Sequence, residues 1–409
     1  VLGLPELDTY FAMARGYQGE NGDVKAFAMK KWFNTNYHYM VPEIDDETTL
    51  QLAGNKPFAL FQEALEQGVL TKPVLIGPYT FLKLAKYTGE KTATDFAVDA
   101  ARAYGEILTK FADLGAEWVQ LEEPCLVMDL TDADRALFVQ LYETILAEKH
   151  TVKVLLQTYF GDVRDCYADL CKLDFDCIQY HVFPAGKVLF AGVVNGKNIW
   201  RNHYNKTIQI VSELQKHCEE VVLHTSCSLL HVPYTLKNET KLAESYKKHF
   251  AYAEEKLSEL ADLKEILNSE QPTETEAYQK NAQLFLGTRS GEDKAVQQKV
   301  AALSEKDFVR LPAFAEREAI QKNSFQLPIL PTTTIGSFPQ TTDIRATRAA
   351  FRKGNITTEQ YETYMKEKIA ECVKLQEEIG LDVLARAKTN SKPVPVSVWS
   401  STPWLTKTF

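Results

Sequence analysis

The residues best suited to binding chemistry lie in one run near the amino terminus, residues 31–43. This run, Lys-Trp-Phe-Asn-Thr-Asn-Tyr-His-Tyr-Met-Val-Pro-Glu, is dense in aromatic and amide side chains. Aromatic rings stack on a flat ligand, amides hydrogen-bond it, and Lys31 is suited to hold an anionic group. The alternative is a packed loop in which the same side chains satisfy one another. The run therefore predicts either a ligand-binding rim or a structural loop.

Polar residues also follow four apolar runs that we predict to be strands. These polar residues are Glu122-Glu123, Tyr159 to Asp162, Asn195 to Lys197, and Ser226 to Ser228. In a barrel of parallel strands, the carboxyl ends of the strands form the face that binds ligands. We therefore expect these four groups to share one face of the protein.

Two of these groups resemble sites of other kinds. Glu122-Glu123 resembles a catalytic acid pair, but we interpret it as structural. His224 and His231 lie close to Cys227 in the sequence, as metal ligands would. Because no second cysteine-rich cluster accompanies them, the pattern is not typical of a zinc site. We predict no metal site in this chain.

The composition is that of a soluble globular protein, with 45% hydrophobic and 25% charged residues among 409. A net charge of -9 argues against a general nucleic-acid or anionic-membrane binder, since both need basic surface. The seven cysteines are an odd number spread along the chain, which favours a reducing compartment. No apolar stretch reaches 18 residues. We expect a soluble, cytoplasmic protein.

Short apolar runs alternate with longer amphipathic segments from about residue 70 to 260. We predict strands at 73–78, 118–121, 152–158, 188–193 and 221–225, and helices at 96–114, 132–148, 163–173, 206–217 and 240–261. Such alternation indicates an α/β fold with a parallel sheet covered by helices. A (β/α)8 TIM barrel and an open doubly wound sheet both fit. We favour the barrel, because no G-x-G-x-x-G motif follows a first strand.

One connection is too short for this layout. A strand predicted to end at Tyr180 is followed by one that starts at Val188, whereas a parallel crossover needs a dozen residues or more. Either this is an unusual hairpin, or residues of the natural protein are missing from the sequence. We prefer missing residues.

The residue composition changes after residue 261. We divide the chain into a barrel over 1–261, a helical spacer over 262–309, and an extended, proline-containing linker over 310–331. A second unit opens over 332–384, with an amphipathic helix at 358–379, and an atypical tail follows over 385–409.

Several long motifs resemble those of the cobalamin-independent methionine synthases. They include Ala14 to Gly16, Lys31 to Glu43, Tyr159 to Arg164, Val194 to Trp200, Thr225 to His231, and Leu330 to Gln340. The resemblance runs from about residue 6 to 384 and identifies the chain as the N-terminal half of such an enzyme. It implies two (β/α)8 barrels joined by a linker, and methyl transfer from 5-methyltetrahydropteroyltri-L-glutamate to L-homocysteine, the final step of methionine biosynthesis.

The resemblance also assigns binding residues. Lys31 and Asn36 match positions that contact the folate tail, and Ile335, Gly336 and Ser337 match a segment that binds homocysteine or methionine. It implies zinc as the cofactor and no cobalamin, because a zinc-bound thiolate is a strong nucleophile at neutral pH. The implied partners are the two substrates and the C-terminal barrel of the same polypeptide, in a monomer.

The chain departs from the family in three places. An Arg-Glu-Leu-Lys motif at the start is absent, so we expect missing residues near 3–5 as well as 178–187. After Leu384 the sequence differs, and the family's zinc ligands and catalytic histidine have no counterparts. We therefore expect no catalytic or metal-binding residues in this chain, and no activity from the chain alone.

Two alternatives to this interpretation remain open. One is a non-catalytic fragment that still binds folate or packs on a separate C-terminal half. The other is an unrelated TIM-barrel enzyme of the uroporphyrinogen-decarboxylase type.

Overall fold

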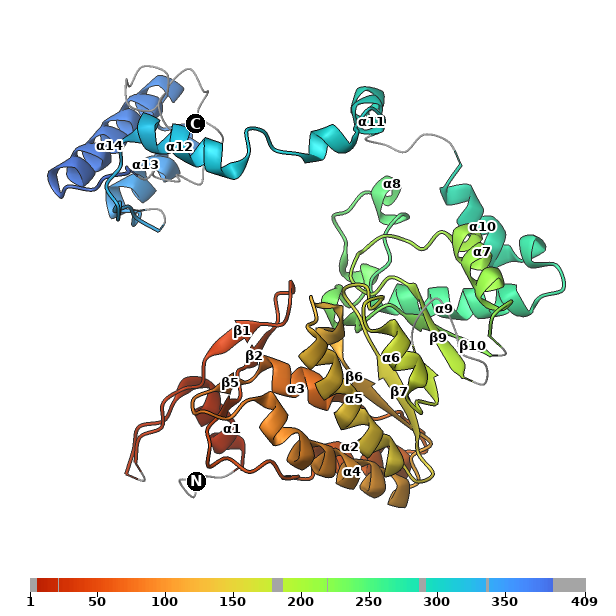
Figure 1. The fold of residues 1–409 in the computed structure, drawn as a ribbon. Coiled ribbons are helices and arrows are strands. Elements are labelled where there is room, and N and C mark those ends of the chain that lie inside the picture. The colour runs from red at the N-terminus through yellow and green to blue at the C-terminus, as the bar shows by residue number, and fades with distance from the viewer. Residues whose placement is uncertain are drawn as a thin grey trace. The chain divides into compact units, whose positions relative to one another are not determined.

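The structure is a computed structural model that describes residues 6–20, 22–178, 187–218, 220–286, 292–335 and 338–384. The chain forms two compact units that divide between residues 290 and 291. The first unit contains a parallel sheet with helices, and the second contains helices (Figure 1).

The centre of the first unit is a six-stranded parallel sheet. Its order is β10-β9-β8-β7-β6-β4, so the strands of this sheet lie side by side in the order in which they occur along the chain. The strands are β4 (Val74–Ile76), β6 (Trp118–Glu122), β7 (Lys153–Gln157), β8 (Cys177–Ile178), β9 (Val188–Val194) and β10 (Val221–Thr225). All five strand positions predicted from 70 to 260 are confirmed, as is the α/β class.

The closed barrel is not found among the described residues. Strands β4 and β10 are the two edges of the sheet and do not pair with each other. The remaining strands form small sheets of their own: β1 (Met29–Lys31) pairs antiparallel with β2 (His38–Met40), and β3 (Glu43–Ile44) pairs with β5 (Lys86–Tyr87). Because only six residues separate β1 from β2, the two close into a hairpin instead of joining the large sheet.

The open edge also changes the burial of the first predicted strand. We expected residues 73–78 to form a buried strand, but the side chains of Val74 and Ile76 are 51% and 38% exposed. Strand β4 pairs with β6 alone, so its other side has no neighbouring strand in the described chain.

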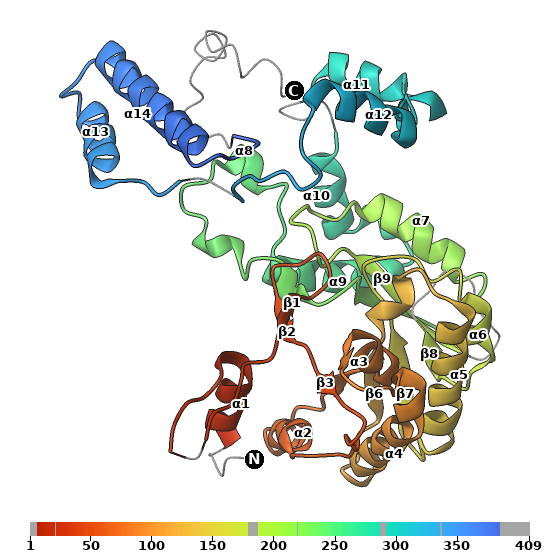
Figure 2. The ribbon, with the colours of Figure 1, turned by 60° about the vertical axis from the view of Figure 1, so that its left-hand side comes forward.

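Helices lie between β4 and β6, β6 and β7, β7 and β8, and β9 and β10 along the chain, and pack beside the sheet (Figures 1 and 2). Thr131 begins α5 with a capping box to Asp134, and Gly115 ends α4 with a φ of +81°, a conformation that favours glycine. The helices of the first unit are α1 (Glu6–Arg15), α2 (Lys56–Glu66), α3 (Pro78–Leu84), α4 (Ala97–Asp113), α5 (Asp132–Ala147), α6 (Tyr167–Lys172), α7 (Tyr204–Leu214), α8 (Glu244–Lys247), α9 (Ala253–Asn268) and α10 (Glu276–Leu284).

The main core lies between the sheet and helices α3, α4 and α5. Alternate residues of β6 and β7, such as Val119 and Val154, are fully buried against aromatic side chains of the helices. The rings of Phe138 and Tyr142 lie 4.7 Å apart. Since side chains alternate across a strand, the other face of β6 carries Gln120 and Glu122, and this polar face leads to the site described below.

The short connection between β8 and β9 is not a hairpin, because the two strands pair in parallel, with Ile178 opposite Leu189. Our prediction of missing residues near 3–5 and 178–187 falls almost wholly on residues 1–5 and 179–186, which lie outside the described residues.

The second unit contains α11 (Lys294–Ala301), α12 (Phe314–Phe325), α13 (Thr342–Arg352) and α14 (Thr358–Glu378). Helix α14 confirms the predicted helix at 358–379. Helix α12 contradicts the extended conformation predicted for 310–331. Its residues lie between Pro312 and Pro328, contain no proline and are rich in helix formers, so the prolines bound a helix instead of preventing one. No helix in the described parts of the chain is long and apolar enough to cross a membrane.

Candidate functional site

The run predicted to bind a ligand lies on the carboxyl-end rim of the sheet. The β1–β2 hairpin carries the run, and the Trp32 amide closes its turn by donating to the Tyr37 carbonyl over 2.7 Å. The Tyr37 hydroxyl then donates to the Leu230 carbonyl over 2.8 Å, joining residues 193 positions apart. The tertiary structure thus brings the aromatic run and the loop after β10 together.

Aromatic packing holds this contact in place. The Phe160 ring centroid lies 5.8 Å from that of Phe33 and 5.3 Å from that of His231, which itself lies 5.7 Å from Tyr37. Edge-to-face pairs of this kind each add about 0.5–1.5 kcal/mol beyond area burial. This packing agrees with the structural-loop interpretation for Phe33 and Tyr37.

Lys31 and Asn36 lie in the same turn but do not take part in that packing. Both side chains are exposed, and neither makes a hydrogen bond or ion pair with another residue in the described part of the chain. Both are therefore accessible to a ligand at the rim, which is the role that the sequence predicts for them.

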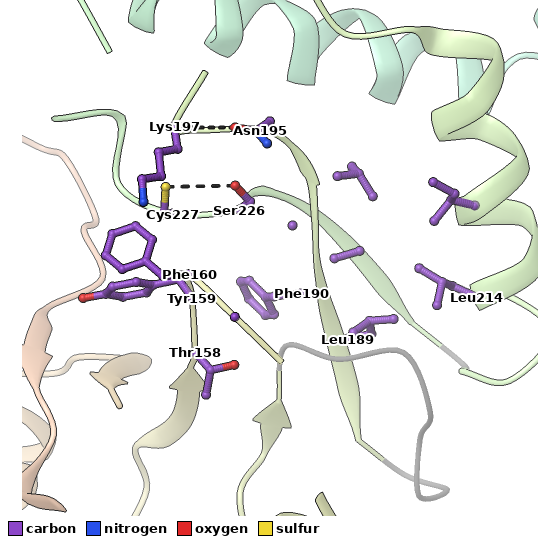
Figure 3. Close-up of a pocket in the computed structure, with 15 residues that line it drawn as sticks. Thr158, Tyr159, Phe160, Leu189, Phe190, Asn195, Lys197, Leu214, Ser226 and Cys227 are labelled. Atoms are coloured by element: carbon purple, nitrogen blue, oxygen red, sulfur yellow. Dashed lines mark hydrogen bonds between the residues drawn. The ribbon is translucent and has the colours of Figure 1, made fainter. Parts of the chain in front are cut away.

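A cavity of about 460 Å³ lies beside this hairpin, along β9 and the ends of β7 and β10 (Figure 3). Its walls combine aromatic and aliphatic side chains with a few polar groups, namely Thr158, Asn195, Lys197, Ser226 and Cys227. An apolar pocket with a few convergent polar groups is the usual form of a small-molecule site. Three of the four polar groups predicted to share a face meet here.

Lys197 is the cation of this cavity. Its ammonium lies 4.2 Å from the centroid of the Phe160 ring and donates a hydrogen bond to the Asn34 side-chain oxygen. Asn195 shapes the loop that carries it, because the Asn195 side chain accepts from the amides of Lys197 and Asn198 over 2.9 and 3.0 Å. The cation therefore links the rim cavity directly to the hairpin turn.

The backbone is unusual where the hairpin meets the rim. Phe33 and Phe160 have φ angles of +51° and +75°, although neither is a glycine. For a bulky side chain this conformation costs on the order of 1–3 kcal/mol, and such residues cluster at ligand clamps and active sites. Gly196 is required for another reason, because a Cβ there would lie 2.5 Å from the Cys227 carbonyl oxygen.

The two acidic residues after β6 have different surroundings. Glu122 accepts hydrogen bonds from Tyr159 over 2.8 Å and from Gln120 over 3.0 Å, and burial raises its pKa. Glu123 is fully buried and accepts from the Tyr79 and Thr80 amides at the start of α3, over 3.0 and 2.6 Å. Glu123 thus caps a helix, as expected for a structural residue.

The described residues do not supply a zinc site. They contain no group of three or more His, Cys, Asp or Glu side chains placed to hold a metal ion. The Nδ1 atom of His224 contacts the Thr225 carbonyl oxygen at 2.6 Å, and burial raises the pKa of the Cys227 thiol.

The predicted homocysteine-binding residues belong to the second unit. Ile335 is fully exposed there, while Gly336 and Ser337 lie outside the described residues. Nearby, the Thr332 amide and hydroxyl both donate to the Asp382 carboxylate over 2.8 Å. The segment that leads into Ile335 is therefore tied to the residues that follow α14.

Comparison with known families supplies the identification. Residues 3–219 match the family described as "Cobalamin-independent synthase, N-terminal domain". That match covers more than half of the 409 residues. The chain belongs to the cobalamin-independent methionine synthase family. This result excludes an enzyme of the uroporphyrinogen-decarboxylase type.

The expectation that the chain is the N-terminal half of such an enzyme needs correction. Residues 330–392 match the description "Cobalamin-independent synthase, Catalytic domain", so the chain includes parts of both family domains. This second match also extends into the segment 385–409 that we had described as an atypical tail.

Curated relatives in this family are similar over nearly the whole chain. A protein from Streptococcus suis is 50% identical over 400 residues, and one from Lactococcus lactis is 48% identical over 401. Each match covers 95% of this chain and 53% or 52% of the relative. Both are named 5-methyltetrahydropteroyltriglutamate–homocysteine methyltransferase. The chain spans about half the length of the curated relatives it matches.

Solved structures show a weaker likeness. A putative vitamin-B12-independent methionine synthase from Listeria monocytogenes is 16% identical with a TM-score of 0.43, and covers 55% of this chain and 72% of its own. A B12-independent methionine synthase from Shewanella is 15% identical with a TM-score of 0.40, and covers 65% and 73%.

Proposed function

We propose that this chain is part of an enzyme that transfers a methyl group from 5-methyltetrahydropteroyltri-L-glutamate to L-homocysteine, and that its first unit binds the acidic tail of the folate. The observation that carries the proposal is the hairpin turn on the rim of the sheet. The turn carries Lys31 and Asn36, whose side chains are exposed and without partners in the described chain, and it contacts Lys197 of the partly apolar cavity through Asn34. A cation and an amide suit the carboxylates of a glutamyl tail.

The proposal also covers the homocysteine site, the barrel fold and the state of the whole enzyme. We place homocysteine at Ile335, Gly336 and Ser337 in the second unit. The six-stranded sheet, with its parallel strands in chain order and its polar carboxyl ends, supports a relation to the family's (β/α)8 barrel. We propose that the enzyme is a cytoplasmic monomer that completes its site with a C-terminal barrel of the same polypeptide.

Tail recognition is tested with two ligands that differ in the number of glutamates. Pteroyltriglutamate should bind more tightly than pteroylmonoglutamate, and Lys31→Met should weaken triglutamate binding by about 5- to 10-fold, the size of one lost charge-assisted contact. Monoglutamate binding should change less. Calorimetric titration of each variant measures both affinities.

The matched control is Lys280→Met. Lys280 is also an exposed lysine, but it lies on α10 and pairs with Glu276. The Lys280→Met variant should bind both pteroyltriglutamate and pteroylmonoglutamate as tightly as the unaltered protein does. Equal binding of the two ligands by the unaltered protein would rule out tail recognition by this chain.

Zinc is the cofactor that we propose for the complete enzyme, where it would activate the homocysteine thiol. Since the described residues lack a fitting ligand set, we assign no step through the metal to this chain. The alternative function is a fragment that binds folate without catalysis, and the missing ligand set favours it for the chain alone.

The 409-residue chain is therefore expected to form no methionine when supplied with zinc, homocysteine and the methylated triglutamate donor. Mass spectrometry of the products measures turnover, while metal analysis of the same sample counts bound zinc. Tail binding should persist in this sample, which separates a folded binding fragment from an unfolded chain. Methionine formation above the enzyme-free rate would contradict the expectation.

A further inference from the structure

We propose that Lys197 is a second cationic anchor for the glutamyl tail, which holds one carboxylate of the tail at the rim cavity while Lys31 holds another. This inference rests on the proposed function and extends it to a residue on a different element. It makes the cavity beside β9 part of the folate site.

The first reason is the charge of Lys197. Its ammonium has three donors, and the partners found for it are the neutral Asn34 amide and the Phe160 ring. No carboxylate in the described chain lies within ion-pair distance of it. Glu122, an acidic residue of the same rim, is bonded to Tyr159 and Gln120. A half-buried cation without a counter-ion attracts an anionic ligand more strongly than an exposed lysine does.

The second reason is that the surroundings hold Lys197 in one position. Its loop is fixed on one side by the Asn195 side chain and on the other by the close approach of Gly196 to Cys227. Farther along, the buried Lys256 ammonium donates to the Trp200 carbonyl over 3.2 Å. Because the loop is ordered before a ligand arrives, little conformational entropy is lost on binding.

The third reason is the position of the cation relative to the hairpin. The Asn34 contact places Lys197 against the middle of the turn that begins at Lys31 and contains Asn36. A tail of several linked carboxylates can engage both lysines at once, whereas a single carboxylate cannot. The aromatic wall of the cavity, Phe160 and Tyr159, suits the aminobenzoyl ring to which the tail is attached (Figure 3).

The competing explanation is that Lys197 only fastens the hairpin to the rim through Asn34. The two roles predict different results for different substitutions. Lys197→Met removes the charge and the Asn34 contact together. Asn34→Ala removes the same contact but leaves the charge. Lys197→Arg keeps the charge and serves as the conservative variant.

The test is calorimetric titration of the 409-residue chain with pteroyltriglutamate and pteroylmonoglutamate. We expect Lys197→Met to weaken triglutamate binding by about 10-fold and monoglutamate binding by less, since a half-buried charge contributes more than an exposed one. Asn34→Ala should stay within about 2-fold, and Lys197→Arg should retain most of the affinity. Raising the salt concentration should weaken binding by the unaltered protein more than by Lys197→Met.

Each outcome is decisive for one of the two proposals. If the unaltered chain does not prefer the triglutamate, the proposed function fails and this inference falls with it. If the preference exists and depends on Lys31 but survives Lys197→Met, this inference alone is overturned. If Asn34→Ala weakens binding as much as Lys197→Met does, Lys197 is a structural residue. A thermal unfolding curve for each variant identifies any that is misfolded. If Lys197→Met is misfolded, Lys197→Gln, which also removes the charge, replaces it in the comparison.

Discussion

Replacement of Glu123 by alanine is expected to lower the free energy of unfolding by about 3–4 kcal/mol at pH 7. The Glu123 carboxylate is fully buried and accepts from the Tyr79 amide, the Thr80 amide and the Tyr142 hydroxyl. Alanine would leave two buried amides at the start of α3 without an acceptor, and a cavity in place of the side chain. Urea unfolding followed by circular dichroism measures the loss.

Two variants sharpen this test. Tyr142→Phe removes one donor and leaves the carboxylate in place, so it should cost about 1 kcal/mol. Glu117→Gln alters an exposed carboxylate next to β6 and should change stability by less than about 0.5 kcal/mol. If Glu123→Ala behaves like Glu117→Gln, the carboxylate does not stabilise the start of α3.

The pH dependence of stability gives a second readout for Glu123. Burial raises its pKa to about 7, and the hydrogen bonds from Thr80, Tyr142 and Tyr79 oppose that rise only in part. The folded protein therefore keeps a proton that the unfolded chain releases between pH 4.5 and about 7. The contribution of Glu123 to the free energy of unfolding is therefore greatest below pH 4.5 and falls as the pH rises to about 7. The unaltered protein should lose more stability from pH 5 to pH 8 than Glu123→Ala does.

Replacement of Lys256 by methionine is expected to lower the free energy of unfolding by about 3–5 kcal/mol, because it removes a nearby positive charge from the buried Glu259 and leaves Arg201 as its ion-pair partner. Lys256 and Glu259 lie one turn apart on α9, and their side chains are 1% and 0% exposed. Burial lowers the pKa of Lys256 and raises that of Glu259, and each charge opposes the shift of the other. Arg201 is the other cation near Glu259, at 4.0 Å, and is partly exposed.

The control for Lys256 lies on the same helix. Lys264→Met changes an exposed lysine of α9 and should have little effect on urea unfolding. The double variant with Lys256→Met and Glu259→Leu should recover part of the loss, since it removes both buried charges. If the double variant loses more stability than the two single variants together, the two buried charges do not stabilise each other. Glu259 also accepts from the Asn202 amide over 2.9 Å, so recovery should be incomplete.

Lys256 also affects the proposed folate site indirectly. Its ammonium fixes the Trp200 carbonyl, and Glu259 fixes the Asn202 amide, so both hold the end of the loop that begins at Asn195. The core of the first unit and the shape of the rim therefore depend on the same buried charges.

The sequence by itself determined most of the elements of this protein and predicted which of its residues bind ligands. Apolar runs bounded by turn residues predicted five strands of the large sheet, and amphipathic periodicity predicted α4, α5 and α14, because these patterns reflect local burial. The run from Lys31 to Glu43 and the polar groups after the strands were recognisable from residue type alone. The long motifs also identified the family, since such matches can be recognised without knowing the fold.

Only the tertiary structure decided which of these residues meet. Asn34 and Lys197 are 163 positions apart, and no spacing rule predicts their hydrogen bond. The positive φ angles of Phe33 and Phe160 arise where the hairpin packs on the rim, so neither residue type signals them. Glu122 and Glu123 are neighbours in sequence, yet their side chains point to opposite faces of the sheet. Glu123 is buried and caps the start of α3, whereas Glu122 contacts Tyr159 at the rim. The openness of the sheet was likewise decided by pairing: β1 and β2 are close enough in the chain to satisfy each other, and a local hairpin needs less loop closure than a distant sheet edge.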